Sequence, residues 1–302
     1  MRLIFRMLSS SVVLASALAL AGPAKAPAKP DGGAKDAGTA TRSDQAALVF
    51  CAPAYPGTTE EAQSRMDEIA SSLAELSGWP KERLSAIYFP QEKAGLARLA
   101  EADAALALVP LPFFLQHEAG LKLTARLAVV QKGLEATQAW ALVAKKGAVK
   151  SPADLDGWQV FSTAGYAPAF VTHAALAGYA LPASVKVTTG GQVLSALRKA
   201  AAGTEKLAVL VDAEQAASLG SLPFGAELEV VHTGPRVPVA VVATVGERLS
   251  AAEWKALAAA FPKLGTTPRG TAALEGVRLT GFVALDAAAL AAARKAFAGA
   301  SK

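Results

Sequence analysis

Short apolar runs alternate with helix-patterned segments along most of this chain, and this alternation restricts the folds open to it. Residues 47–53 are apolar and end in a proline, as a buried strand does. Residues 58–78 then place apolar side chains at helical spacing, with threonine at the start, acids in the first turn and glycine at the end. Strands that alternate with helices pack into sheets covered by helices. We therefore expect an α/β fold built on mostly parallel sheets flanked by helices.

Two pairs of extended runs interrupt this rhythm, with no helix inside either pair. They are residues 122–132 with 136–146, and residues 227–233 with 237–245. Extended pairs at both ends of a central α/β block indicate an inserted lobe joined by two crossing strands. The predicted lobes are residues 46–135 plus 240–302 for lobe 1, and residues 136–239 for lobe 2. Such a clamshell binds its ligand between the lobes, at loops that follow the carboxyl ends of strands.

The first 26 residues have the three parts of a secretory signal. Two arginines are followed by an apolar run over 9–21 and by small residues up to Ala26. This run is shorter than the roughly 20 apolar residues that a membrane span needs. We expect a signal peptide over 1–26, a flexible Ala/Pro/Gly/Lys-rich linker over 22–45, and a soluble periplasmic body. A retained amino-terminal anchor is the alternative.

Composition excludes several classes of function. Cys51 is the single cysteine, so no internal disulfide forms. The three histidines are far apart in sequence and do not have the spacing of metal ligands, so we expect no metal site. The net charge of +5 includes basic residues of the leader and tail. The charge of residues 46–302 is close to balanced, and they contain no arginine-rich stripe with aromatics, so we expect no nucleic-acid partner.

Catalytic motifs are absent from the sequence. It contains no G-x-S-x-G nucleophile elbow and no glycine-rich phosphate loop of the P-loop type. We therefore expect a protein that is not an enzyme and that uses no cofactor.

Several stretches of the chain resemble one known family when they are taken in order. They are residues 103–114, 149–170 with the phrase S-x-x-D-L-x-G, 206–219 followed by 230–243, and 265–286. In this order they resemble the periplasmic binding proteins of phosphonate, phosphite and phosphate ABC importers (PhnD-like). The similarity covers about residues 48–285. It implies the type II periplasmic-binding fold, an oxyanion ligand and an ABC permease as partner.

The sequence departs from this family at the ligand loops. The family's Ser-Thr-Ser-Gly is here Ser162, Thr163, Ala164 and Gly165, so one hydroxyl is missing. Thr189, Gly190 and Gly191 replace a Ser-His pair at the next helix start. The resemblance therefore leaves the identity of the ligand open.

The candidate ligand loop joins a strand expected over 158–163 to a helix expected over 167–179. Free amides and the positive end of a helix favour an oxyanion there. The candidate residues of this loop are Ser162, Thr163, Ala164, Gly165 and Tyr166. Helix capping by Ser162 or Thr163 is the alternative.

Other candidates lie at further loops of the same kind. Thr189 and Gly190 precede a helix and could donate in the same way, or form an ordinary turn. Tyr55 follows the first strand and could stack on a ligand, or be a partly buried loop tyrosine. Asp212 could receive a cationic group or cap a helix. Arg236, near a lobe crossing, could clamp an anion or be a solvated hinge residue.

The resemblance adds Pro110 and Leu111, in a proline-rich turn that it places at the cleft. We expect an exported, monomeric solute-binding protein that closes on a small, anionic ligand by hinge motion and serves an ABC importer. Two alternatives stay open: a sensory binding protein for a membrane receptor, and a periplasmic enzyme on the same fold, similar to cyclohexadienyl dehydratases.

Overall fold

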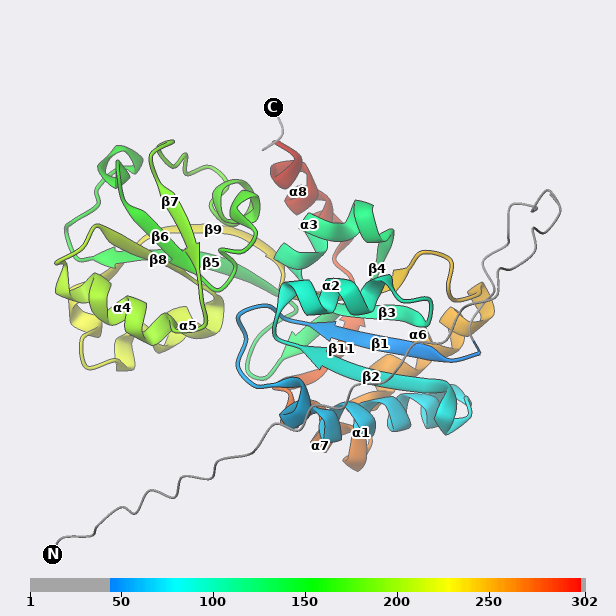
Figure 1. Ribbon diagram of the computed structural model, residues 1–302. Coiled ribbons are helices and arrows are strands. Elements are labelled where there is room, and N and C mark those ends of the chain that lie inside the picture. Colours follow the sequence, from blue (N-terminus) through cyan, green and yellow to red (C-terminus); the bar gives the residue numbers. More distant parts are fainter. Residues whose placement is uncertain (1–43, 300–302) are drawn as a thin grey trace, which may run out of the picture. The chain divides into compact units, whose positions relative to one another are not determined.

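The computed structural model describes residues 44–299. The signal peptide predicted over 1–26 and nearly all of the linker predicted over 22–45 lie outside the described residues. Two β-sheets, each with helices packed on it, make up the described part of the chain (Figure 1). None of its helices is long and apolar enough to cross a membrane.

The first sheet has six strands in the order β11-β4-β10-β3-β1-β2. Their bounds are β1 (Ala46–Cys51), β2 (Leu84–Phe89), β3 (Ala104–Pro110), β4 (Leu123–Gln131), β10 (Ala240–Val245) and β11 (Leu279–Ala284). β1 is parallel to β2 and to β3. β10 is antiparallel to both β3 and β4, and β11 is antiparallel to β4.

The second sheet has five strands in the order β7-β6-β8-β5-β9. Their bounds are β5 (Thr137–Lys145), β6 (Gln159–Ser162), β7 (Lys186–Thr189), β8 (Leu207–Val211) and β9 (Leu228–Pro238). β6 is parallel to β7 and β8, whereas β5 is antiparallel to β8 and β9.

The predicted α/β fold class is confirmed, but the expectation of mostly parallel sheets is corrected. Both sheets are mixed, because each contains strands of the extended pairs that carry the chain between sheets. The chain leaves the first sheet after β4 and enters the second at β5, then returns from β9 to β10. A strand that arrives directly from the other sheet, without a crossover helix, pairs antiparallel more readily. The exact lobe boundaries stay a prediction.

Helices cover both faces of the six-stranded sheet (Figure 1). The helix bounds are α1 (Thr59–Ser77), α2 (Glu92–Ala100), α3 (Leu111–Leu121), α4 (Val193–Ala202), α5 (Ala213–Ser218), α6 (Ala251–Leu264), α7 (Pro268–Gly276) and α8 (Ala287–Ala298). α1, α6 and α7 enclose a core around Met66, Ile69 and Phe261. A second core contains Phe113 and Phe114 of α3 and extends to Trp140 of the other sheet. A third joins α4 to β8.

Helix α1 has the ends that its sequence predicts. Thr58 accepts a hydrogen bond from the amide of Glu61, and the Glu61 side chain accepts one from the Thr58 amide. This reciprocal capping box satisfies donors that a helix start leaves free. Gly78 closes the helix at φ 72°, a left-handed conformation that glycine adopts at little cost.

Two local expectations are wrong. The proline-rich turn expected at Pro110 and Leu111 is instead the start of α3, because a proline within the first helical turn gives up no needed hydrogen bond. The helix expected over 167–179 is reduced to a short π-helix, η3 (Phe170–Ala175). There the Thr172 hydroxyl donates to the Pro168 carbonyl at 3.0 Å, which competes with regular helical bonding.

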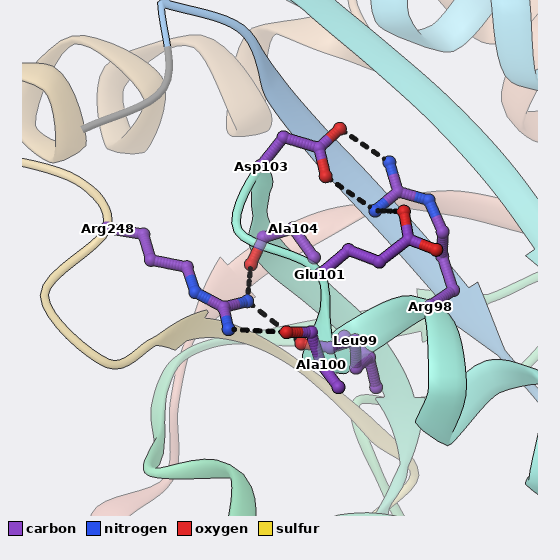
Figure 2. Close-up of polar contacts among 7 residues, drawn as sticks. All are labelled: Arg98, Leu99, Ala100, Glu101, Asp103, Ala104 and Arg248. Atoms are coloured by element: carbon purple, nitrogen blue, oxygen red, sulfur yellow. Dashed lines mark hydrogen bonds and ion pairs between the residues drawn. The ribbon is translucent and has the colours of Figure 1, made fainter. Parts of the chain in front are cut away.

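Arg248 binds the carboxyl end of α2. It lies at the end of the first sheet where β1 and β3 begin, away from their carboxyl ends. Figure 2 shows its guanidinium directed at three main-chain carbonyls. Nη1 donates to Leu99 at 2.8 Å and to Ala104 at 2.6 Å, and Nη2 donates to Ala100 at 3.4 Å. A cation at the carboxyl end of a helix satisfies free carbonyls and complements the helix dipole.

Arg98 and Asp103 reinforce the same turn (Figure 2). The guanidinium donates two hydrogen bonds to the carboxylate, at 2.8 and 2.7 Å. Their contact lowers the pKa of Asp103, since hydrogen bonds from Arg98 favour the charged form.

Candidate functional site

A cavity of about 900 Å³ opens where strands of both sheets reach their carboxyl ends. On the six-stranded side, Tyr55 follows β1 and Pro110 ends β3. On the five-stranded side, Thr163 follows β6 and Asp212 follows β8. Ligands of α/β proteins bind at this end of their sheets, because loops and helix amino termini converge there.

The residues predicted for the site divide into three groups. Tyr55, Pro110, Thr163 and Asp212 line the large cavity. Ala164 and Tyr166 line a neighbouring cavity of about 10 Å³, to which Tyr55, Pro110 and Thr163 also contribute. The residues that line neither cavity are Leu111, Ser162, Gly165, Thr189, Gly190 and Arg236.

Ser162 and Gly165 shape the loop after β6 from inside. Ser162 is fully buried; its hydroxyl donates to the Leu210 carbonyl at 2.9 Å and accepts from the Ala164 amide at 3.2 Å. A Cβ on Gly165 would lie 2.2 Å from the Thr188 carbonyl oxygen, so only glycine allows the loop to pack this closely on β7. These contacts hold the loop in place.

Thr163 is the residue of this loop that lines the large cavity. It is buried, and no hydrogen bond ties its hydroxyl to another residue in the described part of the chain. A buried hydroxyl is normally hydrogen-bonded, to protein, water or ligand. Its hydroxyl can therefore donate to a bound anion.

The amino terminus of α4 opens into the same cavity. Gln192 precedes the helix, and no side chain caps its first amides. Five consecutive residues line the cavity here, from Gly191 to Ser195. An uncapped helix start presents free N–H groups and a partial positive charge. Arg198, one turn further along α4, adds a full positive charge to the wall.

Among the cations that line the cavity, Arg198 is the one without a carboxylate partner among the described residues. Its guanidinium lies 5.8 Å from the centre of the Phe224 ring, and it has no ion pair with another residue that the structure describes. By contrast, Arg278 pairs with Glu214 of α5, and Lys132 lies 3.4 Å from Glu275. A cation without a carboxylate partner is available to a bound anion.

Two tyrosines shape the wall on the β1 side. The Tyr88 hydroxyl donates to the Pro56 carbonyl at 3.2 Å and fixes the loop that carries Tyr55. Burial, and secondarily the charge of Asp212, raises the pKa of Tyr55 to about 12. The Tyr55 hydroxyl therefore keeps its proton at neutral pH and can donate a hydrogen bond.

Asp212 has the capping role that was one of the two considered for it. It caps α5, since its carboxylate accepts from the Gln215 amide at 2.8 Å. It is also buried in the cavity wall, and burial raises the pKa of its carboxyl even though the Gln215 amide and Arg278 oppose the shift. A carboxyl of raised pKa takes up a proton more readily, and the protonated form donates a hydrogen bond.

Arg236 lies at the crossing between the sheets. It pairs with Glu135, and its Nη2 donates to the Thr137 carbonyl at 2.6 Å. These contacts engage its guanidinium within the protein, and the hinge role named as its alternative stays a prediction.

Sequence reasoning missed much of the wall. α1 contributes the stripe Thr58, Glu61, Ala62, Arg65 and Met66, and Gly276 to Leu279 join from the end of α7 and the start of β11. The helical spacing of these residues predicts a helix but does not indicate which of its faces lines a cavity. The sequence did contain one signal of the site at α4. Gln192 precedes this helix where a good capping residue would be expected, so the first amides are left without a side-chain partner.

Solved structures of similar architecture identify the fold class of this chain. XAC2383 from Xanthomonas citri, solved with bound chloride, is similar at a TM-score of 0.66 and 16% identity, over 86% of this chain and 98% of that chain. The same protein solved with ATP gives 0.65 and 15% over the same shares. PhnD1 from Prochlorococcus marinus, in complex with methylphosphonate, gives 0.59 and 12%, over 86% of this chain and 100% of that one. The fold is the type II periplasmic-binding fold, as predicted.

The family follows from the sequence match. Residues 60–290 match the family described as phosphonate ABC transporter, periplasmic substrate-binding protein. This chain therefore belongs to the family of periplasmic substrate-binding proteins of phosphonate ABC transporters. The resemblance and the function as a substrate-binding protein for an ABC importer are confirmed, and neither the sensory nor the enzymatic alternative is favoured. No protein of curated function matches the chain.

Proposed function

We propose that this chain captures a phosphonate- or phosphate-like oxyanion in its 900 Å³ cavity and delivers it to an ABC permease. The observation that carries the proposal is the uncapped start of α4, which lines one cavity together with Arg198 and the Thr163 hydroxyl. Amide donors, a hydroxyl donor and a guanidinium are the groups that proteins use to bind an anion.

The protonation states of the wall support an anionic ligand. Tyr55 stays a neutral donor, because its pKa lies at about 12. Burial raises the pKa of Asp212, so this carboxyl takes up a proton more readily than an exposed carboxyl does. The similar protein PhnD1 was solved with methylphosphonate, which supports a ligand of this class here.

The test is isothermal titration calorimetry of the purified protein without residues 1–26, with methylphosphonate, phosphate, phosphite, sulfate and malonate. We expect binding of one phosphorus oxyanion per chain. Thr163→Val removes the hydroxyl at nearly constant size and should weaken binding roughly 10- to 100-fold, since a hydrogen bond to a charged group contributes about 1.5–3 kcal/mol. Ser64→Val, on the exposed side of α1, is the matched control. Equal affinity of the two variants would refute the assignment of Thr163.

We also propose that the protein is exported by the signal peptide of residues 1–26, acts as a monomer and does not turn over its ligand. Amino-terminal sequencing of the periplasmic protein should begin between residues 22 and 27. Light scattering should give the mass of one chain. Phosphorus NMR should show methylphosphonate unchanged after incubation, and formation of phosphate would favour an enzyme instead.

A further inference from the structure

Cations also line the cavity on the six-stranded side. Arg65 comes from α1, Lys132 directly follows β4, and Arg278 directly precedes β11. β4 and β11 are paired strands, and the Lys132 amide donates to the Arg278 carbonyl at 3.1 Å. Lys132 and Arg278 are therefore neighbours in the wall, in a part of it that the proposed oxyanion site at α4 does not use.

The backbone of Arg278 has a conformation that is unfavourable for an arginine. Its φ is 61°, in the left-handed region that glycine adopts at little cost. In the described part of the chain, the other non-glycine residues with a positive φ are Ala54 and Lys122. Lys122 closes α3 and lines neither cavity, whereas Arg278 lines the large one. An arginine at a strained position in the wall of a cavity indicates that its side chain acts there.

The Arg278 guanidinium has donors to spare for a ligand. Its Nη2 pairs with Glu214 of α5, and no hydrogen bond engages its Nε or Nη1 within the described part of the chain. The two side chains of this ion pair are 70% and 48% exposed, and exposed ion pairs are weak. Because an arginine has several N–H donors, the remaining ones are available to a bound anion.

Arg278 and the start of α4 belong to different parts of the cavity. Glu214, the partner of Arg278, lies on α5, which follows β8, whereas α4 follows β7. β6 lies between these two strands in the sheet, so the starts of α4 and α5 are two strand spacings, roughly 10 Å, apart. The charge of Arg278 also reaches Asp212 at the start of α5, where it opposes the rise in pKa that burial causes. One phosphonate group is too small to contact both the amides of α4 and Arg278.

We infer that the natural ligand carries a second anionic group in addition to the oxyanion at α4, and that Arg278 binds this second group. The inference rests on the proposed function, because the first oxyanion is taken to bind at α4. The cavity, at about 900 Å³, has room for a ligand of two groups. Lys132, next to Arg278, adds to the attraction for a negative charge and to the repulsion of a positive one.

The test is a titration series on the purified protein without residues 1–26. Phosphonoacetate, 3-phosphonopropionate and 4-phosphonobutyrate place a carboxylate at increasing distance from the phosphonate, and each is compared with the phosphonate that has an uncharged methyl ketone in place of the carboxylate. We expect at least one carboxylate compound to bind roughly three- to fivefold more tightly than its ketone, the gain that an exposed ion pair allows. This gain should shrink at high salt. 2-Aminoethylphosphonate should bind no more tightly than methylphosphonate.

A pair of glycine variants assigns the gain to one side chain. Arg278→Gly removes the guanidinium from a left-handed position, and Lys122→Gly makes the same change at the end of α3, outside the cavity. Since glycine relieves strain at such positions, both variants should unfold at or above the wild-type temperature without ligand. We expect Arg278→Gly to lose the gain from the carboxylate and to bind methylphosphonate normally, and Lys122→Gly to keep both.

The outcomes separate this inference from the proposed function. Equal affinity for each carboxylate and its ketone, or tighter binding of 2-aminoethylphosphonate than of the carboxylates, would overturn the second anionic group and leave oxyanion capture standing. A gain that survives in Arg278→Gly, or an equal loss for methylphosphonate and the carboxylates in that variant, would overturn the assignment to Arg278. No binding by any member of the series would overturn both the inference and the proposed function.

Discussion

Ser162 and Thr163 are adjacent in sequence, yet their hydroxyls meet different surroundings. The buried Ser162 hydroxyl donates to the Leu210 carbonyl and accepts from the Ala164 amide. Thr163 lines the cavity, and no hydrogen bond engages its hydroxyl within the described part of the chain. The sequence could place both in one loop after a strand, but it could not say which side chain turns outward, because that depends on the pairing of β6 with β8.

Ser162→Ala should therefore act on stability and not on ligand binding. It leaves a buried carbonyl and amide without their partner, a loss of about 1–3 kcal/mol in the free energy of unfolding. Urea unfolding measures this loss, and titration with methylphosphonate should give an affinity within about twofold of wild type. Thr163→Val should show the reverse pattern. A Ser162→Ala protein with wild-type stability and lost binding would reverse our assignment of the two residues.

Asp212 gives a pH-dependent prediction at the same scale. Burial raises the pKa of its carboxyl above the ordinary 3.8 in the folded protein. Protonation of Asp212 therefore stabilises the fold, and this contribution is complete below about pH 3.8 and is lost as the pH rises through the raised pKa. Asp212→Asn removes the charge and keeps an efficient helix cap.

The variant should accordingly be as stable as wild type or more stable at pH 7, and its advantage should shrink as the pH falls toward 4. Urea unfolding at pH 7, 5.5 and 4 measures the difference. Asp67→Asn, on the exposed side of α1, is the matched control and should show no such trend. A stability difference between Asp212→Asn and wild type that stays constant or grows toward pH 4 would contradict the burial argument.

Among the elements, those with complete local signals were predictable. α1 has its capping box, its apolar stripe and its closing glycine in the sequence, and the structure confirms each. α3 was missed because an apolar segment flanked by prolines shows no polar face, although a proline at its second position suits a helix start. The cavity wall as a whole was not predictable, since it needs α1, both sheets and the end of α7 in one place, and these are far apart in sequence.

Arg248 should stabilise the carboxyl end of α2, and its substitution measures how much. Its guanidinium supplies donors to the last carbonyls of α2, and water would replace them poorly at this partly buried position (Figure 2). Arg248→Ala should lower the free energy of unfolding by roughly 2 kcal/mol. Arg269→Ala, at an exposed position of α7, should change it by less than about 0.5 kcal/mol.

Arg248 is far from the cavity wall, at the opposite end of the strands. The folded Arg248→Ala protein should therefore bind methylphosphonate with wild-type affinity, and the loss should appear only in denaturant. An unchanged unfolding midpoint would show that the three carbonyl contacts contribute nothing to stability.

For the whole molecule, the type II fold and the family were accessible from sequence because weak resemblances recur in the right order over most of the chain. The ligand was less accessible. The loops that depart from the family, at Ala164 and at Thr189 to Gly191, are those that adjoin the cavity. There the structure contributes what the sequence could not, namely an uncapped start of α4 that lines one cavity with Thr163 and Arg198.

The central claim is that this cavity binds an oxyanion between Thr163 and the start of α4. A crystal structure of the body grown with methylphosphonate tests it most directly. We expect the phosphonate oxygens within hydrogen-bond distance of the Thr163 hydroxyl and of an amide between Gly191 and Ser195. Phosphonate bound outside this cavity, or a cavity that stays free of it at saturating concentration, would contradict the claim.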